Sequence, residues 1–287
     1  MPRKIITEQL KVDIIDFYKN NKVSLQEVAT EFNLSFPTIS KILSGIKKYT
    51  KNELFNPDLN ESYFSKIDSG NKAYFIGLLI ADGNVFKYND NSNRQTSISV
   101  TLAEEDNYIL YKFKEELNSK TALIADKRRN NIANTFAFRS NKIADDLAKY
   151  SIIPNKTFHT YLPEVPEQYM SDLIRGILDG DGSIRCKQSG KENRNRFFHY
   201  IGFCGTHKLM QDISDYLADK LNLNVRPKVY DYKDRNLSEI HISNVADICK
   251  VGDFLYKDAE LYLTRKYNKF INIKNHYNIQ DNTELTK

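Results

Sequence analysis

The first 48 residues show the three- and four-residue spacing of apolar positions that is typical of amphipathic helices. Apolar side chains at positions 12, 15 and 18 predict a first helix that ends near residue 22. Ser24 and Ser35 can each cap a further helix, because a serine oxygen accepts hydrogen bonds from the free amides of a first turn. Asn33 lies between these two helices and is suited to a left-handed turn. We therefore predict a small all-α unit over residues 1–48.

The two capped helices have the spacing of a helix-turn-helix. Ala29 is small where the helices would cross, Asn33 makes the turn four residues later, and apolar residues lie at fixed offsets on both sides. Such a unit can bind DNA, or it can be a helical bundle used for packing only. In the DNA-binding interpretation the second helix of the motif enters the major groove, and its candidate contacts are Phe36, Thr38, Ser40 and Lys41.

Residues 49–69 are polar and rich in turn-forming residues, which predicts a linker. From residue 70 onward, strand-type alternation and helical spacing follow each other. The expected strands span 84–88, 96–102, 122–127 and 135–139 in one stretch and 183–187, 197–203, 225–232 and 238–243 in the next. Helices over 104–117 and 208–221 separate the second strand from the third in each stretch. The two stretches therefore share one order of elements.

The two stretches also share a motif. Residues 75–83 read FIGLLIADG and residues 174–182 read IRGILDGDG, so that a glycine and a final Asp-Gly recur at the same positions. A second echo follows at nearly the same offset, SNKIAD at 140–145 and SNVAD at 243–247. Two matches in one register indicate an internal duplication.

Each copy of the motif predicts a helix with a nearly bare face. The small residues that make this face, four positions apart in each copy, are Gly77 with Ala81 and Gly176 with Gly180. A face without large side chains lets two backbones approach closely, so we expect the two helices to pack on each other at the centre of the molecule. Gly83 and Gly182 are expected to end these helices as left-handed caps.

The same packing would bring two acids together. Asp82 and Asp181 would lie at helix C-termini, where the helix dipole is already negative, and across the interface from each other. Such a pair costs stability unless a cation shares it, and oxygen ligands of this kind suit Mg²⁺, which also binds phosphate oxygens. The pattern therefore indicates metal-dependent phosphodiester chemistry. The alternative, that Asp-Gly is only a common turn after a helix, would have to apply twice in the same register.

Composition narrows the class of protein. The 287 residues, 40% of them hydrophobic, suffice for two domains or for one duplicated domain with an appendage. The three cysteines are widely spaced and unpaired in sequence, which indicates neither a zinc site nor a disulfide framework. Residues 73–81 form the longest apolar stretch, which is too short to cross a membrane. We expect a cytoplasmic, nucleoid-associated or organelle-interior protein that is not secreted.

On the two acidic motifs, residues 70–276 resemble the LAGLIDADG homing endonucleases in their single-chain, two-motif form. The resemblance implies an α+β fold in which two αββαββα repeats, related by a pseudo-twofold axis, form saddle-shaped antiparallel sheets over DNA. The expected domains are a helix-turn-helix at 1–48, a linker at 49–69, and repeats at 70–162 and 163–287. The motif departs from the family at 75–76 and 174–175, where Leu-Ala is usual. It also departs at Ile80, although its counterpart Asp179 keeps the motif's first acid.

The resemblance also implies roles for particular residues. Asp82 and Asp181 correspond to the catalytic acids that bind the metal, with Ala81 and Gly180 beside them at the metal site. Members of the family place a basic residue near each catalytic centre. By position, Lys156 and Lys266 are the candidates for this role, and the alternative is that both are ordinary surface lysines.

Basic residues gather on the expected strands and hairpins, although the formal net charge is only +5. Arg and Lys on such strands can contact phosphates or guanine edges, and Gln can read adenine. The alternative is a solvated hairpin rim. The candidates are Lys127, Arg128, Arg129 and Arg139 in the first repeat and Arg185, Lys187, Gln188, Lys191, Arg194, Arg196 and Lys228 in the second.

The sequence thus predicts a monomeric homing endonuclease that makes a staggered double-strand break in a long, pseudo-palindromic DNA site. Hydrolysis would depend on Mg²⁺, with Mn²⁺ as a substitute, and would need no nucleophilic side chain. Two alternatives share the fold. One is a DNA-binding regulator that has lost cleavage, against which the intact acid pair argues. The other is an RNA-splicing maturase, which would bind intron RNA and could keep both acids.

Overall fold

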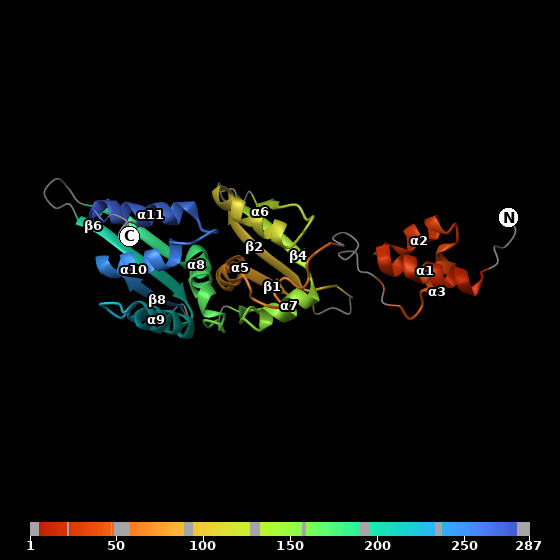
Figure 1. Ribbon diagram of the computed structural model, residues 1–287, viewed down its shortest axis with the longest axis horizontal. Coiled ribbons are helices and arrows are strands. Elements are labelled where there is room, and N and C mark those ends of the chain that lie inside the picture. The colour runs from red at the N-terminus through yellow and green to blue at the C-terminus, as the bar shows by residue number, and fades with distance from the viewer. Residues whose placement is uncertain are drawn as a thin grey trace, which may run out of the picture.

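The computed structural model describes residues 6–21, 23–46, 48, 58–88, 94–126, 133–156, 159–189, 196–232 and 237–279. The chain begins with three helices, α1 (Glu8–Asn21), α2 (Leu25–Glu31) and α3 (Phe36–Ile42), which have a hydrophobic core of their own (Figure 1). As predicted, the side chains of Ser24 and Ser35 accept amide hydrogen bonds at the starts of α2 and α3. Asn33 has the predicted left-handed backbone, with φ of 48°.

The rest of the chain runs twice through one series of elements. The first series is α5 (Gly70–Ala81), β1 (Gly83–Phe86), β2 (Ser97–Ala103), α6 (Asn107–Glu116), β3 (Ile124–Asp126), β4 (Ala133–Arg139) and α7 (Asn141–Ala148). The second is α8 (Met170–Asp181), β5 (Ser183–Ser189), β6 (Arg196–Gly205), α9 (His207–Leu221), β7 (Val229–Tyr232), β8 (Leu237–Ile242), α10 (Val245–Tyr256) and α11 (Thr264–His276). Short 3-10 helices, η1 (Glu104–Asp106) and η4 (Glu167–Tyr169), precede α6 and α8.

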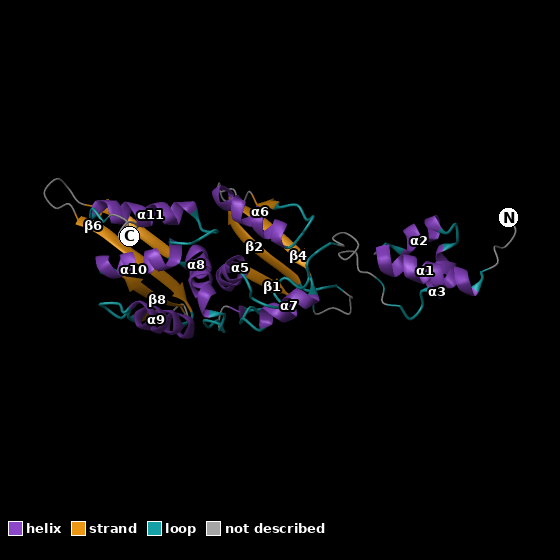
Figure 2. Ribbon diagram, in the orientation of Figure 1, coloured by secondary structure: helices purple, strands orange, loops and turns teal. Residues whose placement is uncertain are grey.

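Each series forms one four-stranded antiparallel sheet, with the orders β1-β2-β4-β3 and β5-β6-β8-β7 (Figure 2). Burial alternates along β2, β4 and β8, so one face of each sheet lies in the core and the other faces solvent. The mixed α+β class is as expected. One predicted strand begins late, since residues 225–228 lie outside β7. Pro227 explains the difference, because proline has no amide to donate to a strand ladder.

Residues 58–69, which we predicted as part of a linker, are packed onto the first repeat. Tyr63, Phe64 and Ile67 are buried in the main hydrophobic core. The Tyr63 hydroxyl also donates a hydrogen bond of 2.7 Å to the carboxylate of Glu116 on α6. The prediction of a linker was based on the polar composition of this segment, which gave too little weight to these three apolar side chains. The remainder of the predicted linker, residues 49–57, lies outside the described residues.

Helices α5 and α8 lie against each other between the two sheets (Figure 1). A methyl group on Gly77 would lie 2.0 Å from the carbonyl oxygen of Leu173, and one on Gly176 would lie 2.1 Å from that of Tyr74. The two contacts are equivalent, because Tyr74 and Leu173 each stand three residues before the motif glycine. Any residue larger than glycine would therefore separate the helices.

The glycines that follow the two aspartates serve a different purpose from the one predicted. Gly182 has φ of −91° and ψ of 174°, and Gly83 lies in β1 without a positive φ, so the prediction of left-handed caps is wrong. A methyl group on Gly83 would lie 2.4 Å from the carbonyl oxygen of Leu79, and one on Gly182 would lie 2.6 Å from that of Leu178. The chain turns from helix to strand too tightly for a side chain.

No helix in the described ranges is both long enough and apolar enough to cross a membrane.

Gly176→Ala should lower the free energy of unfolding by about 3 kcal/mol, because the added methyl group meets backbone that cannot move alone. Chemical denaturation monitored by circular dichroism measures the change. Gly205→Ala is the control, since its methyl group would meet only side-chain ends, the nearest on Leu209 at 3.1 Å. Equal costs for the two substitutions would contradict the close approach of α5 and α8.

Candidate active site

Asp82 and Asp181 lie at the C-terminal ends of the two touching helices. Asp82 is the C-cap of α5, and Asp181 is the last residue of α8. Both side chains are exposed to solvent. They lie close together across the interface, because a Cβ atom on Gly180 would be 3.2 Å from Oδ2 of Asp82 and 2.2 Å from Cβ of Ala81. Gly180 is the residue just before Asp181, so the helix contact brings the two acids to one place.

The surroundings of the two carboxylates disfavour their charged forms. The pKa of Asp82 rises from 3.8 to about 6, first because the surrounding protein displaces water and second because Asp181 is nearby. Partial loss of hydration also raises the pKa of Asp181. Lys156 and Lys266 act in the opposite direction on both groups. A bound cation would act in the same direction as the lysines.

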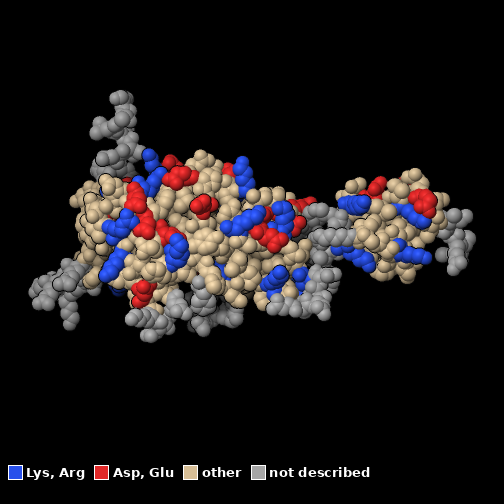
Figure 3. Space-filling model, turned by 90° about the horizontal axis from the view of Figure 1, so that it is seen from below, with Lys and Arg blue, Asp and Glu red and all other residues tan. Residues whose placement is uncertain are grey.

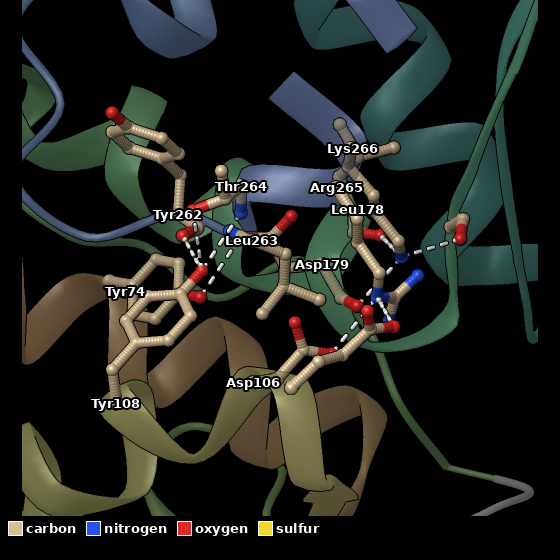
Figure 4. Close-up of polar contacts among 12 residues, drawn as sticks. Tyr74, Asp106, Tyr108, Leu178, Asp179, Tyr262, Leu263, Thr264, Arg265 and Lys266 are labelled. Carbon is tan, nitrogen blue, oxygen red and sulfur yellow. Dashed lines mark hydrogen bonds and ion pairs between the residues drawn. The ribbon is translucent and has the colours of Figure 1, made fainter. Parts of the chain in front are cut away.

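Each helix end is covered by one of the two predicted lysines. The Lys266 ammonium group is buried and donates to the carbonyl oxygens of Leu178, Asp179 and Gly182 at 2.6–2.7 Å (Figure 4). Lys156 donates to the carbonyl oxygens of Ile80 at 2.6 Å and Ala81 at 2.8 Å. A cation at the carbonyl end of a helix is stabilised by the helix dipole.

Loss of hydration lowers the pKa of both lysines, that of Lys266 to about 8. Their contacts are with main-chain carbonyls at the ends of α5 and α8, and both interact electrostatically with Asp82, so neither is an ordinary surface lysine.

The donor set at this place fits a hard divalent cation. Asp82 and Asp181 offer exposed carboxylate oxygens whose repulsion a cation would relieve. Within the described ranges, no group of three His, Cys, Asp or Glu side chains is arranged to hold a metal. Further ligands would have to be main-chain oxygens, water or a phosphate. The carbonyl of Ala81, a predicted participant, already accepts a hydrogen bond from Lys156.

Several polar residues near the site had no role assigned to them from the sequence. Cys204 on β6 donates from its thiol to the carbonyl oxygen of Asp181 at 2.8 Å. Arg175 and Asp179 are buried on α8 beneath the acids. The available signal was a pair of charged residues, four positions apart, in a stretch of α8 (173–179) whose other residues are apolar or glycine.

Comparison with solved structures identifies the fold of the chain. No protein-family model and no curated protein matches the sequence. Among solved structures, the chain is similar to the meganuclease I-SmaMI bound to uncleavable DNA, with a TM-score of 0.53 and 13% identity over 73% of this chain and 90% of that one. It is also similar to the LAGLIDADG homing endonuclease I-LtrWI bound to target DNA, with a TM-score of 0.51 and 11% identity over 77% of this chain and 91% of that one.

The chain has the LAGLIDADG homing-endonuclease fold. The fold that the two acidic motifs predicted is thereby confirmed. Helices α5 and α8 are the LAGLIDADG helices of this chain, and Asp82 and Asp181 occupy the last acidic position of each motif.

The two sheets carry some of the basic residues predicted to contact DNA on their solvent faces. Arg185 and Lys187 are exposed and alternate along β5 with Ile184 and Cys186, which point into the repeat. Gln188 is exposed, but it lies on the same side of β5 as Ile184 and Cys186. It therefore does not lie beside the two basic residues. Arg139, at the end of β4, donates to the Tyr88 hydroxyl at 3.3 Å.

The other predicted contacts are less informative. Lys228 is exposed, with its ammonium 5.8 Å from the centre of the Tyr230 ring. Outside the described residues lie Lys127, Arg128, Arg129, Lys191, Arg194 and the side chain of Arg196. On the side of the molecule seen in Figure 3, acidic and basic side chains are interspersed. Charge on that side therefore does not mark a DNA surface.

In the N-terminal unit, the predicted contacts lie on or beside the open face of α3. Phe36 and Lys41 are exposed, while Thr38 and Ser40 are half-buried. Ile39, between them, is buried in the small core. The arrangement leaves one side of α3 accessible to a partner.

Asp82→Asn should stabilise the metal-free protein at high pH. Because the folded-state pKa of about 6 exceeds the ordinary 3.8, the proton on Asp82 favours folding at low pH, and this contribution is lost as the pH rises through the folded value. At about pH 8 the variant should melt at a higher temperature than the wild type, and near pH 4 the two should coincide.

Thermal unfolding followed by circular dichroism in EDTA measures this difference across the pH range. Asp145→Asn, which removes an exposed carboxylate from α7, is the control and should show no such trend. An Asp82 variant that melts together with the wild type at every pH would count against the charge repulsion at the helix ends.

Proposed function

We propose that this protein is a site-specific endonuclease that cuts both strands of DNA with the help of a divalent metal ion. The observation that carries the proposal is the pair of aspartates at the ends of two touching helices, each end also covered by a lysine. Folding does not require two acids at the negative ends of two dipoles. Phosphodiester hydrolysis by a bound cation does require such ligands.

The residues of the chain would divide the work as follows. Asp82 and Asp181 would hold Mg²⁺, or Mn²⁺ in its place, which when bound activates water and neutralises charge on the phosphate. Lys156 and Lys266 limit the repulsion between the acids and oppose the dipoles of α5 and α8. Two acids related by an internal duplication suit two scissile phosphates, one on each strand, and hence a staggered break.

The two sheets support a long DNA site. Their solvent faces carry Arg139, Arg185 and Lys187, which can reach phosphates and base edges. Because the duplicated repeats are similar but not identical, the preferred site would be pseudo-palindromic. One chain contains both acids, so a monomer would suffice. The similar structures of I-SmaMI and I-LtrWI are bound to DNA, which supports duplex DNA as the substrate here.

The N-terminal unit would act as a second DNA-binding module, a helix-turn-helix with α3 in the major groove. Its support is the open side of α3, with Phe36 and Lys41 exposed above a closed core. Tethering a second module to the same duplex raises affinity without changing the chemistry at the acids.

Asp82→Asn and Asp181→Asn should each abolish cleavage, because an amide holds Mg²⁺ far more weakly than a carboxylate does. The wild type and both variants are incubated with a randomised DNA-site library and Mg²⁺, and the cut molecules are sequenced. Asp145→Asn, an equivalent change at an exposed position of α7, should cut as the wild type does. EDTA should stop the reaction.

A wild-type chain that leaves every site uncut, or aspartate variants that cut as well as it does, would overturn the enzyme assignment. DNA binding without cleavage would then favour a regulator. Selective binding of intron RNA would favour a maturase.

Lys41→Ala should weaken DNA binding by about tenfold while changing the cleavage rate of saturated enzyme little, since the lysine lies in the N-terminal module. Binding isotherms at several salt concentrations should show a shallower salt dependence, because one phosphate contact is lost. Lys19→Ala, on α1, is the charge-matched control. An unchanged affinity for the Lys41 variant would mean that α3 is not a DNA-binding element.

A further inference from the structure

The two LAGLIDADG helices differ in charge at two positions of the motif. Helix α5 has Ile76 and Ile80, whereas α8 has Arg175 and Asp179 at the equivalent positions, four residues apart. Both charged side chains are buried, with 2% and 1% of their surfaces exposed. Burying a charge costs stability unless it binds something, so the partners of this pair are informative.

Asp179 joins three elements at one carboxylate oxygen. Its Oδ2 accepts from the amide of Leu263 at 2.8 Å and from the hydroxyl of Tyr74 at 2.9 Å (Figure 4). Leu263 stands immediately before α11, and Tyr74 belongs to α5. The carboxylate on α8 therefore fixes the start of α11 and contacts the opposite LAGLIDADG helix at the same time.

Arg175 holds the same connection one helical turn earlier. Its Nε donates to the carbonyl oxygen of Leu261 and its Nη1 to that of Leu255, both at 2.6 Å. An ion pair with Asp172 occupies its third nitrogen. Arg175 thus binds carbonyls and Asp179 binds an amide of residues 255–263, which run from the last residues of α10 to the start of α11. We call this pair the polar clamp.

The first repeat contributes to the same place. The Tyr108 hydroxyl, from α6, donates to the carbonyl oxygen of Tyr262 at 2.6 Å and accepts from the amide of Thr264 at 2.8 Å. Arg265 donates to the buried Asp106 at 3.0 Å. Figure 4 shows these contacts around the first turn of α11, next to Lys266. The residues that precede Lys266 are therefore held from both repeats.

The segments that carry Lys156 and Lys266 are held in place differently. Lys266 follows the clamped connection by three residues, and its three N–H groups are taken by three carbonyls. The ammonium of Lys156 makes two hydrogen bonds within the described residues, and Lys156 directly follows a turn at residues 154–155. Copy one has isoleucines where copy two has the polar clamp, so these two positions of α5 offer no polar side chain to the segment that carries Lys156.

We propose that Arg175 and Asp179 are positioning residues, which fix the connection 255–263 so that Lys266 is held at the end of α8, and that the two catalytic centres are consequently unequal. The proposal rests on the proposed function for its catalytic part. Loosening the polar clamp should disturb the cut that depends on Lys266 more than the cut that depends on Lys156.

The test compares Asp179→Leu with Ile80→Leu, which place one residue type at the equivalent positions of the two helices. Amide hydrogen exchange across residues 261–266 should become about tenfold faster in D179L and should stay unchanged in I80L. Asp179→Asn keeps an acceptor for the Leu263 amide and should exchange nearly as the wild type does. This measurement needs no DNA, so it does not depend on the proposed function.

Single-turnover cleavage of DNA labelled separately on each strand gives the second readout. In D179L the cut of one strand should slow by about tenfold relative to the other, because a loosely placed group contributes less to the reaction. The slowed strand should be the one that Lys266→Met slows most. Adding D179L to K266M should slow that strand no further, a non-additivity that a general loss of stability would not produce.

The outcomes separate the two proposals. Unchanged exchange at 261–266 in D179L, or equal slowing of both strands, overturns the positioning role even if the wild type cuts DNA. Faster exchange together with a wild type that cuts no DNA removes the proposed function and leaves the clamp supported. If D179L does not fold, Arg175→Met carries the same comparison, because it removes both carbonyl bonds and keeps a long aliphatic side chain.

Discussion

The direct backbone contact between α5 and α8 is the constraint on which the rest of the structure depends. Gly77 and Gly176 each face a carbonyl oxygen of the opposite helix, at a distance that excludes a methyl group. Because the helices touch along this line, their C-terminal ends also meet. The residues at these ends must therefore lie next to one another. Asp82 and Asp181 are brought together by a contact made one to two turns away from them.

The composition of the site follows from the charge that this contact concentrates. Two carbonyl helix ends and two carboxylates share a small, partly dehydrated region, which raises the pKa of both acids. A lysine covers each end and limits the repulsion. Here stability alone would favour neutral residues, and the presence of two acids therefore supports the proposal that they bind a cation. The two sheets extend to either side of this centre.

The two repeats have the same topology but differ in the side chains that lie below the acids. Strand order and the glycine contacts are the same in both repeats. Below the acids, however, copy one is apolar and copy two contains a buried arginine and a buried aspartate that hold the connection to α11. A single chain permits this divergence, because each copy can change without changing the other, and the two ends of the site then need not act alike.

The sequence by itself determined the features that depend on local spacing. Residues within a few positions of one another determine the capped helices after Ser24 and Ser35, the left-handed Asn33 and the bare helix faces. They also determine the succession of strands and helices along the chain. Only the tertiary structure decided the rest. The packing of residues 58–69 and the connection held by Arg175 and Asp179 depend on segments far apart in the chain, whose contacts leave no periodic signal along it.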